Sequence, residues 1–269
     1  MDSEVRMRME DAQGSSTLGV HIRRAGGKYV CLLMNHDTFL VVIVLQIVKD
    51  RVYVECMDST GYEQGHARRF MLSILKCINP RITSCFSYPK NEYVFGSSSL
   101  NKDKRVRMPE DLLNYWISIF EEHHGSVHVW SNNYDRISYP FEHEDELVYF
   151  EDDPKQKISR HLNGSITEMF DALLCRTDFV KGSLVYGNTK VYKKSCIKRC
   201  CIADIESMIV SLRSMDFSTL DNARQSTNAF LQMYGLQTEY FQSNKVAKRR
   251  VTKQEECIMI DVKNKRLVK

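Results

Sequence analysis

The chain has 269 residues, of which 43% are hydrophobic, so it can bury a substantial core as one large domain or two small ones. We favour one domain, because no Pro/Gly/Ser-rich linker divides the sequence. The formal net charge of +4 permits acidic or polyanionic partners but requires none. We find neither a signal peptide nor an apolar run of about 18 residues, so we expect an intracellular protein with no membrane partner.

The nine cysteines are odd in number and scattered, which favours reduced thiols over a disulfide framework. The densest group is Cys196, Cys200 and Cys201. Residues 196 and 200 would share one face of a helix, as metal ligands can. No second Cys/His pair at zinc-finger spacing accompanies them, so buried core thiols are the favoured interpretation and no metal is predicted.

Residues 1–16 are polar and aperiodic, which predicts a flexible arm before a single domain over 17–240. Three strand-like runs then follow, separated by short turn-forming breaks, and they predict an antiparallel meander: 29–34, 38–48 and 51–57. The middle run, FLVVIVLQIV, is apolar at nearly every position. It is therefore expected inside the sheet, covered on both faces.

The next segments have helical periodicity. Apolar residues at i, i+3, i+4 and i+7 predict an amphipathic helix over 67–78, which Asn79-Pro80 ends. A second helix is predicted from Pro109, a residue suited to the first helical position, to about residue 125. Strands are expected at 127–130 and 146–150.

The later part of the sequence is predicted to be mostly helical, with a capping box at 165–168 and helices over 197–213 and 218–234. The predicted fold class is therefore α+β, an antiparallel sheet core flanked by helices and followed by a helical C-terminal half. The tail over 241–269 is basic around Lys248-Arg249-Arg250 and Lys253. Such a run serves nuclear import or tethers histone or nucleic acid, and an ordinary solvated terminus is an equal alternative.

The stretch YFEDDPKQK at 149–157 places two adjacent carboxylates before a proline. By itself, Asp153-Pro154 favours a helix N-cap with proline at the first helical position. Capping uses one local hydrogen bond, so Asp152 and Lys155 can still face a cleft.

Six elements in a fixed order add a resemblance to this local pattern: MDSTGY at 57–62, Phe86 with YVF at 93–95, KRVR at 104–107, LLNYW at 112–116, SYP at 138–140 and FEDDPK at 150–155. Together they resemble the fungal histone H3-lysine acetyltransferase family first named as a regulator of Ty-element transposition. That family's fold is related to the acetyltransferase of the metazoan CREB-binding protein. The resemblance spans about 29–235.

The sequence departs from the family pattern at four places, one of which is the short loop after Gly61-Tyr62. The family's long insertion before the Phe86 region is missing, which removes an expected docking point for a chaperone. Tyr115-Trp116 stands where the family has two tryptophans, and Arg105 where it has a histidine.

The resemblance implies an acetyl-CoA cleft, with acetyl-CoA as the cosubstrate. The implied cofactor-binding residues are Met57, Asp58, Ser59, Phe86, Lys90, Tyr93, Arg105, Val106, Arg107 and Tyr115. Guanidinium groups of the basic segment over 102–107 fit phosphate oxygens in a bidentate manner. Without the resemblance, core packing would explain the aromatic residues and a solvated loop would explain the basic ones.

Acetyl transfer to lysine needs a neutral amine, and deprotonating a free lysine at pH 7 costs roughly 4.6 kcal/mol. The resemblance makes Asp153, with Asp152, the candidate that recognises the substrate lysine and accepts its proton. Trp116 would supply an apolar wall at the thioester. Lys155 corresponds to a lysine that is itself acetylated in the family, and burying an acetylated lysine avoids burying a charge.

The resemblance therefore implies a nuclear histone acetyltransferase that modifies newly made histone H3 together with H4, presented by histone chaperones. Chromatin assembly, genome stability, the DNA-damage response and transcription regulation would be its setting. A non-catalytic chromatin or nucleic-acid-binding module is the alternative, with weak nucleic-acid contact through the basic tail. A metal-dependent phosphotransfer enzyme using Asp58, Asp152 and Asp153 ranks last, because no phosphate-binding glycine loop is found.

Overall fold

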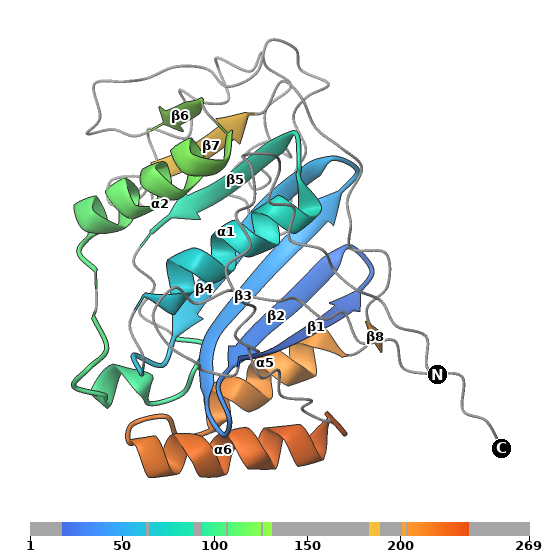
Figure 1. Cartoon of the computed structure of the whole chain (residues 1–269), viewed down its shortest axis with the longest axis vertical. Coiled ribbons are helices and arrows are strands. Elements are labelled where there is room, and N and C mark those ends of the chain that lie inside the picture. Colours follow the sequence, from blue (N-terminus) through green and yellow to red (C-terminus); the bar gives the residue numbers. More distant parts are fainter. Residues whose placement is uncertain are drawn as a thin grey trace, which may run out of the picture.

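The structure, a computed structural model, describes residues 18–62, 65–88, 93–105, 107–124, 126–130, 183–188, 201–202 and 204–236. Within them, eight strands form one sheet in the order β6-β7-β5-β4-β3-β2-β1-β8 (Figure 1). The elements in chain order are β1 (Gly19–Ala25), β2 (Lys28–Met34), β3 (Phe39–Val48), β4 (Arg51–Ser59), α1 (His66–Ile78), β5 (Ile82–Ser87), η1 (Ser98–Leu100), α2 (Pro109–His124), β6 (Val127–Trp130), β7 (Ser183–Asn188), β8 (Cys201–Ile202), α5 (Ile205–Ser214) and α6 (Leu220–Met233).

The predicted meander is present as β2, β3 and β4, which pair antiparallel. In β3 the first seven residues are all buried. Because side chains alternate along a strand, Ile43 faces one core cluster while Val42 and Val44 face the other. The prediction of a strand covered on both faces is confirmed.

Helices cover the two faces of the sheet in pairs (Figure 1). Residues of α1 and α2, such as Phe70 and Phe120, join the core cluster on one face. Residues of α5 and α6, such as Met208 and Phe230, join the cluster on the other. The α+β class is confirmed, and the helices that follow the sheet in sequence form a layer of their own.

Four strands of the described chain were not predicted: β1, β5, β7 and β8. In β1, apolar Val20 and Ile22 alternate with His21 and Arg23, so the strand does not form an apolar run. Strand β7 has six residues and inserts between β5 and β6. At Gly187 of β7, an added Cβ would lie 2.2 Å from the His124 ring, which explains the glycine.

The prediction of a helix beginning at 197 is wrong, because Cys201–Ile202 pair in parallel with β1. Helix α5 begins at Ile205, where the side chain of Asp204 accepts a hydrogen bond from the Ser207 N–H at 3.1 Å. The sheet is also mixed rather than purely antiparallel, since the pairs β4–β5 and β1–β8 are parallel.

Several predictions lie outside the described residues: the arm over 1–16, the strand over 146–150, the capping box over 165–168 and the basic tail. Among the described helices, none has the length and apolar character needed to cross a bilayer.

Candidate functional site

The sheet opens between β4 and β5. These parallel strands are connected through α1, and they pair only along Arg51–Val54 and Ile82–Cys85. Beyond that point β4 stays paired with β3, while β5 stays paired with β7. In open sheets, the crevice outside the carboxyl ends of parallel strands is where ligands bind. A cavity of about 510 Å³ lies at this position.

A bulge in β4 coincides with this opening. Val44 and Leu45 of β3 pair with Cys56 and Val54, which leaves Glu55 as an extra residue in β4. A bulge of this kind bends a strand and increases its twist. The bulge therefore lies where β4 parts from β5.

Nine of the predicted site residues line this cavity: Met57, Asp58, Ser59, Phe86, Tyr93, Arg105, Arg107, Tyr115 and Trp116. They come from β4, β5, the segment around η1 and α2, elements that are far apart in sequence. Five predicted site residues lie outside the described part of the chain: Lys90, Val106, Asp152, Asp153 and Lys155.

The first turn of α1 also belongs to the site, although none of its residues was predicted there. Gly65, His66, Ala67 and Arg68 also line the cavity. This turn has no acidic residue and no side-chain cap, so its backbone N–H groups favour an anion. The missing cap was a signal already present in the sequence.

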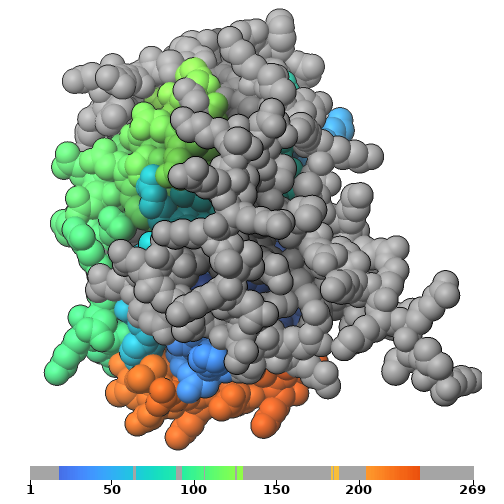
Figure 2. Space-filling view, viewed as in Figure 1, coloured from blue at the N-terminus to red at the C-terminus, as the bar shows by residue number. Residues whose placement is uncertain are grey.

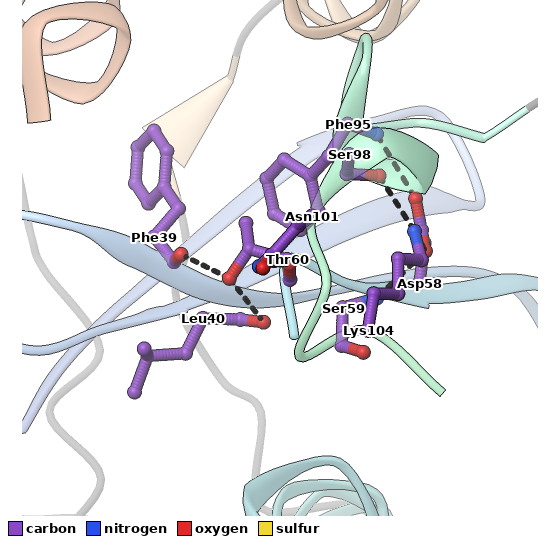
Figure 3. Close-up of polar contacts among 9 residues, drawn as sticks. All are labelled: Phe39, Leu40, Asp58, Ser59, Thr60, Phe95, Ser98, Asn101 and Lys104. Carbon is purple, nitrogen blue, oxygen red and sulfur yellow. Dashed lines mark hydrogen bonds and ion pairs between the residues drawn. The ribbon is translucent and has the colours of Figure 1, made fainter. Parts of the chain in front are cut away.

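Asp58 lines the cavity, and both of its carboxylate oxygens accept hydrogen bonds (Figure 3). Its Oδ1 accepts hydrogen bonds from the Ser59 N–H at 2.8 Å and from the Lys104 ammonium at 2.7 Å. Its Oδ2 accepts from the Phe95 N–H at 3.0 Å. Both oxygens are thus already engaged, which disfavours Asp58 as the metal ligand that the phosphotransfer hypothesis required.

Lys104 of the basic segment lines the cavity, but its ammonium is engaged inside the protein. Its side chain is only 4% exposed, and its ammonium also donates to the Ser98 hydroxyl at 2.6 Å. The same ammonium lies 3.8 Å from the centre of the Tyr93 ring. Burial lowers the pKa of Lys104 below its ordinary value, although the Asp58 carboxylate opposes that shift. Lys104 is therefore an internal cation.

Arg105 and Arg107 remain available from that segment. Arg105 is exposed and Arg107 is half-buried. The segment between η1 and α2 lies at the surface of the molecule (green, left edge of Figure 2). The guanidinium groups of Arg105 and Arg107 can therefore bind phosphates at the mouth of the cavity.

Helix α2 supplies an aromatic wall. Trp116 is 6% exposed, contacts the rings of Tyr115 and Phe120 and also lines the cavity. Burial raises the pKa of Tyr115 to about 12, against the opposing charges of Arg107 and Arg68. Tyr115 therefore stays a neutral phenol at physiological pH. The rings of Tyr115 and Trp116 can pack in the core and line the cavity at the same time.

No protein-family model matches the chain, and no curated protein matches its sequence. Among solved structures, it is similar to Rtt109 from Aspergillus fumigatus, with a TM-score of 0.57 at 12% sequence identity. That similarity covers 92% of this chain and 98% of the Aspergillus protein. It confirms the fold that the sequence resemblance implied: this chain folds as Rtt109 does.

Proposed function

We propose that the protein is an acetyl-CoA-dependent lysine acetyltransferase that acts on histone H3. One observation carries the proposal. Eight residues that the resemblance to the fungal family assigned to acetyl-CoA binding, and Trp116, assigned as the wall at the thioester, line one cavity at the point where β4 and β5 part. The Rtt109 fold of the chain supports the same activity.

The lining of the cavity suits acetyl-CoA. Met57, Leu112 and Trp116 offer apolar contacts to the aliphatic arm and the thioester. Arg105 and Arg107 offer bidentate hydrogen bonds to the phosphates. A volume of about 510 Å³ is ample for the arm of the cosubstrate.

The residues of the chain would contribute to the reaction in three ways. The wall of Tyr115 and Trp116 excludes water from the reacting end of the cavity. The same apolar surroundings disfavour a charged amine there, which offsets part of the roughly 4.6 kcal/mol that deprotonation costs at pH 7. Asp153, with Asp152, is proposed to attract the incoming ammonium and accept its proton.

The finer assignments come from the resemblance to the fungal family. These are newly made histone H3 with H4 as acceptor, histone chaperones as partners, the nucleus as location, and roles in chromatin assembly and genome stability. The proposed autoacetylation of Lys155 belongs with them. A basic tail after residue 245 agrees with nuclear import.

Two measurements on the full chain test this function. Calorimetric titration with acetyl-CoA should give saturable binding, and incubation with acetyl-CoA and H3–H4 should add acetyl groups to H3 lysines by mass spectrometry. Absence of acetyl-CoA binding, together with DNA binding that falls steeply with salt, would instead establish the nucleic-acid-binding alternative.

A further inference from the structure

We propose that Lys104 is a positioning residue for acetyl-CoA: its buried ammonium holds the Asp58 carboxylate and the Tyr93 ring in place on the wall of the cavity. This inference rests on the proposed function. It gives Lys104 a task different from the phosphate contact that its place in a basic run suggests.

The contacts of the ammonium support this role. A lysine has three donors, and here one meets Asp58 at 2.7 Å and one meets Ser98 at 2.6 Å. The charge also lies 3.8 Å from the centre of the Tyr93 ring, a favourable cation–π arrangement. Asp58 and Tyr93 both line the cavity, so one buried cation connects two of its walls.

The backbone of the same segment is anchored independently of Lys104. The Gly96 N–H donates to the Leu212 carbonyl at 3.0 Å, and the Phe217 N–H donates to the Gly96 carbonyl at 2.9 Å. Further along, the Asn101 amide donates to the Thr60 carbonyl at 2.7 Å (Figure 3). Loss of the ammonium should therefore disturb side chains at the cavity while the segment keeps its course.

A close backbone contact fixes the same junction. At Gly61, where φ is +93°, an added Cβ would lie 2.7 Å from the Lys104 Cα. The turn after β4 and the backbone of residue 104 are therefore packed against each other whatever side chain residue 104 carries. Because the backbone contact does not depend on the ammonium, the proposed task of the ammonium is to align the Asp58 and Tyr93 side chains.

Stability alone is a weak explanation for this ion pair. Desolvating two charges offsets most of their attraction, and well-packed apolar residues often replace a buried pair without loss of stability. The pair has side-chain exposures of 4% for Lys104 and 7% for Asp58, so this reasoning applies to it. A role in fixing the geometry of the binding wall accounts for a charge at this buried position.

The test compares Lys104→Met with Lys76→Met in the full chain. Lys76 is an exposed lysine in the last turn of α1, outside the cavity, and receives the same chemical change. For Lys104→Met we expect the Kd and the KM for acetyl-CoA to rise about tenfold or more, with kcat at saturating acetyl-CoA within about twofold of wild type. Lys76→Met should match wild type.

A second variant guards against loss of the fold. Lys104→Gln keeps a hydrogen-bond donor toward Asp58 but removes the charge, and we expect an intermediate rise in Kd. If wild type binds acetyl-CoA and both Lys104 variants bind it equally well, the inference is wrong, and a lowered melting temperature with unchanged Kd would show a merely structural role. Failure of wild type to bind would instead remove the proposed function itself, and the inference with it.

Discussion

The guanidinium of Arg107 lies over the ring of Tyr115, with its Cζ 4.1 Å from the ring centre, and both residues line the cavity. This contact connects Arg107, the cation expected to bind phosphate, with the aromatic wall that Tyr115 and Trp116 form on α2. Because a guanidinium stacks on a ring and still presents hydrogen-bond donors at its edge, Arg107 can hold both contacts at once.

Replacing Arg107 with alanine should therefore weaken acetyl-CoA binding. We expect KM to rise about tenfold with little change in kcat, since phosphate contacts act equally in the ground and transition states. Arg107→Lys should recover only part of the loss, because an ammonium lacks the planar fork. Steady-state kinetics with varied acetyl-CoA give the result, and a fall in kcat alone would speak against a phosphate contact.

Arg105 should behave in the same direction. It is exposed at the cavity mouth, so Arg105→Ala should mainly raise the KM for acetyl-CoA without altering the melting temperature. The weakening should diminish as salt is added, because exposed charge contacts are screened. An effect on kcat that persists at high salt would rule out this assignment.

Trp116 has two roles that a single substitution would confuse. It is 6% exposed and belongs to the core cluster, so Trp116→Ala should cost about 3–5 kcal/mol of folding free energy as well as turnover. Trp116→Phe keeps an apolar wall and should retain the fold with reduced activity. Chemical denaturation beside turnover separates the two effects, and full activity in both variants would reject the wall.

Asp153→Asn should abolish turnover while acetyl-CoA still binds, since asparagine keeps the size of the side chain but cannot accept the proton. Glu151→Gln in the same stretch is the matched control and should stay active. Intact-peptide mass spectrometry of the incubated enzyme should also find Lys155 acetylated. Wild-type turnover by Asp153→Asn, or an unmodified Lys155 in fully active protein, would each contradict the assignment concerned.

The buried histidines predict that stability falls in acid. Burial lowers the pKa of His124 to about 3 and that of His123 to about 4, with smaller contributions from neighbouring positive charge. The unfolded chain binds these protons from about pH 6.5 downward, whereas the folded chain does not. Stability is therefore fully present above pH 6.5 and is lost as pH falls toward 3.

The loss for His124 alone should be about 3 kcal/mol between pH 6.5 and 4. Urea denaturation at several pH values measures it. His124→Gln can keep the hydrogen bond to the Thr83 hydroxyl, which His124 makes at 2.7 Å, and should flatten the acid slope. An unchanged slope in that variant would assign the acid sensitivity to other groups.

The elements at the centre of the fold could be predicted from the sequence, because their buried faces give the apolar residues a clear periodicity along the chain. The continuous apolar run of β3 and the helical spacing of α1 both follow directly from which faces are covered. Strand β1 was missed because His21 and Arg23 interrupt its apolar pattern, although both are buried. The beginning of α5 could have been found from Asp204, a strong N-cap residue.

The cavity could be predicted only in part. The resemblance to the fungal family implied that Met57, Phe86, Tyr93 and Trp116 lie at one cleft, and all four line the cavity. The inward direction of Lys104 could not be read from the sequence, because a basic run looks the same whether a given cation faces solvent or a buried carboxylate. That distinction depends on Asp58, 46 residues earlier in the chain.

The most direct test of the account is calorimetric titration of acetyl-CoA into the full chain, with Arg107→Ala titrated in parallel. We expect saturable binding of one molecule per chain and markedly weaker binding by the variant. No saturable heat in the wild-type protein, or equal affinity in the two proteins, would contradict it.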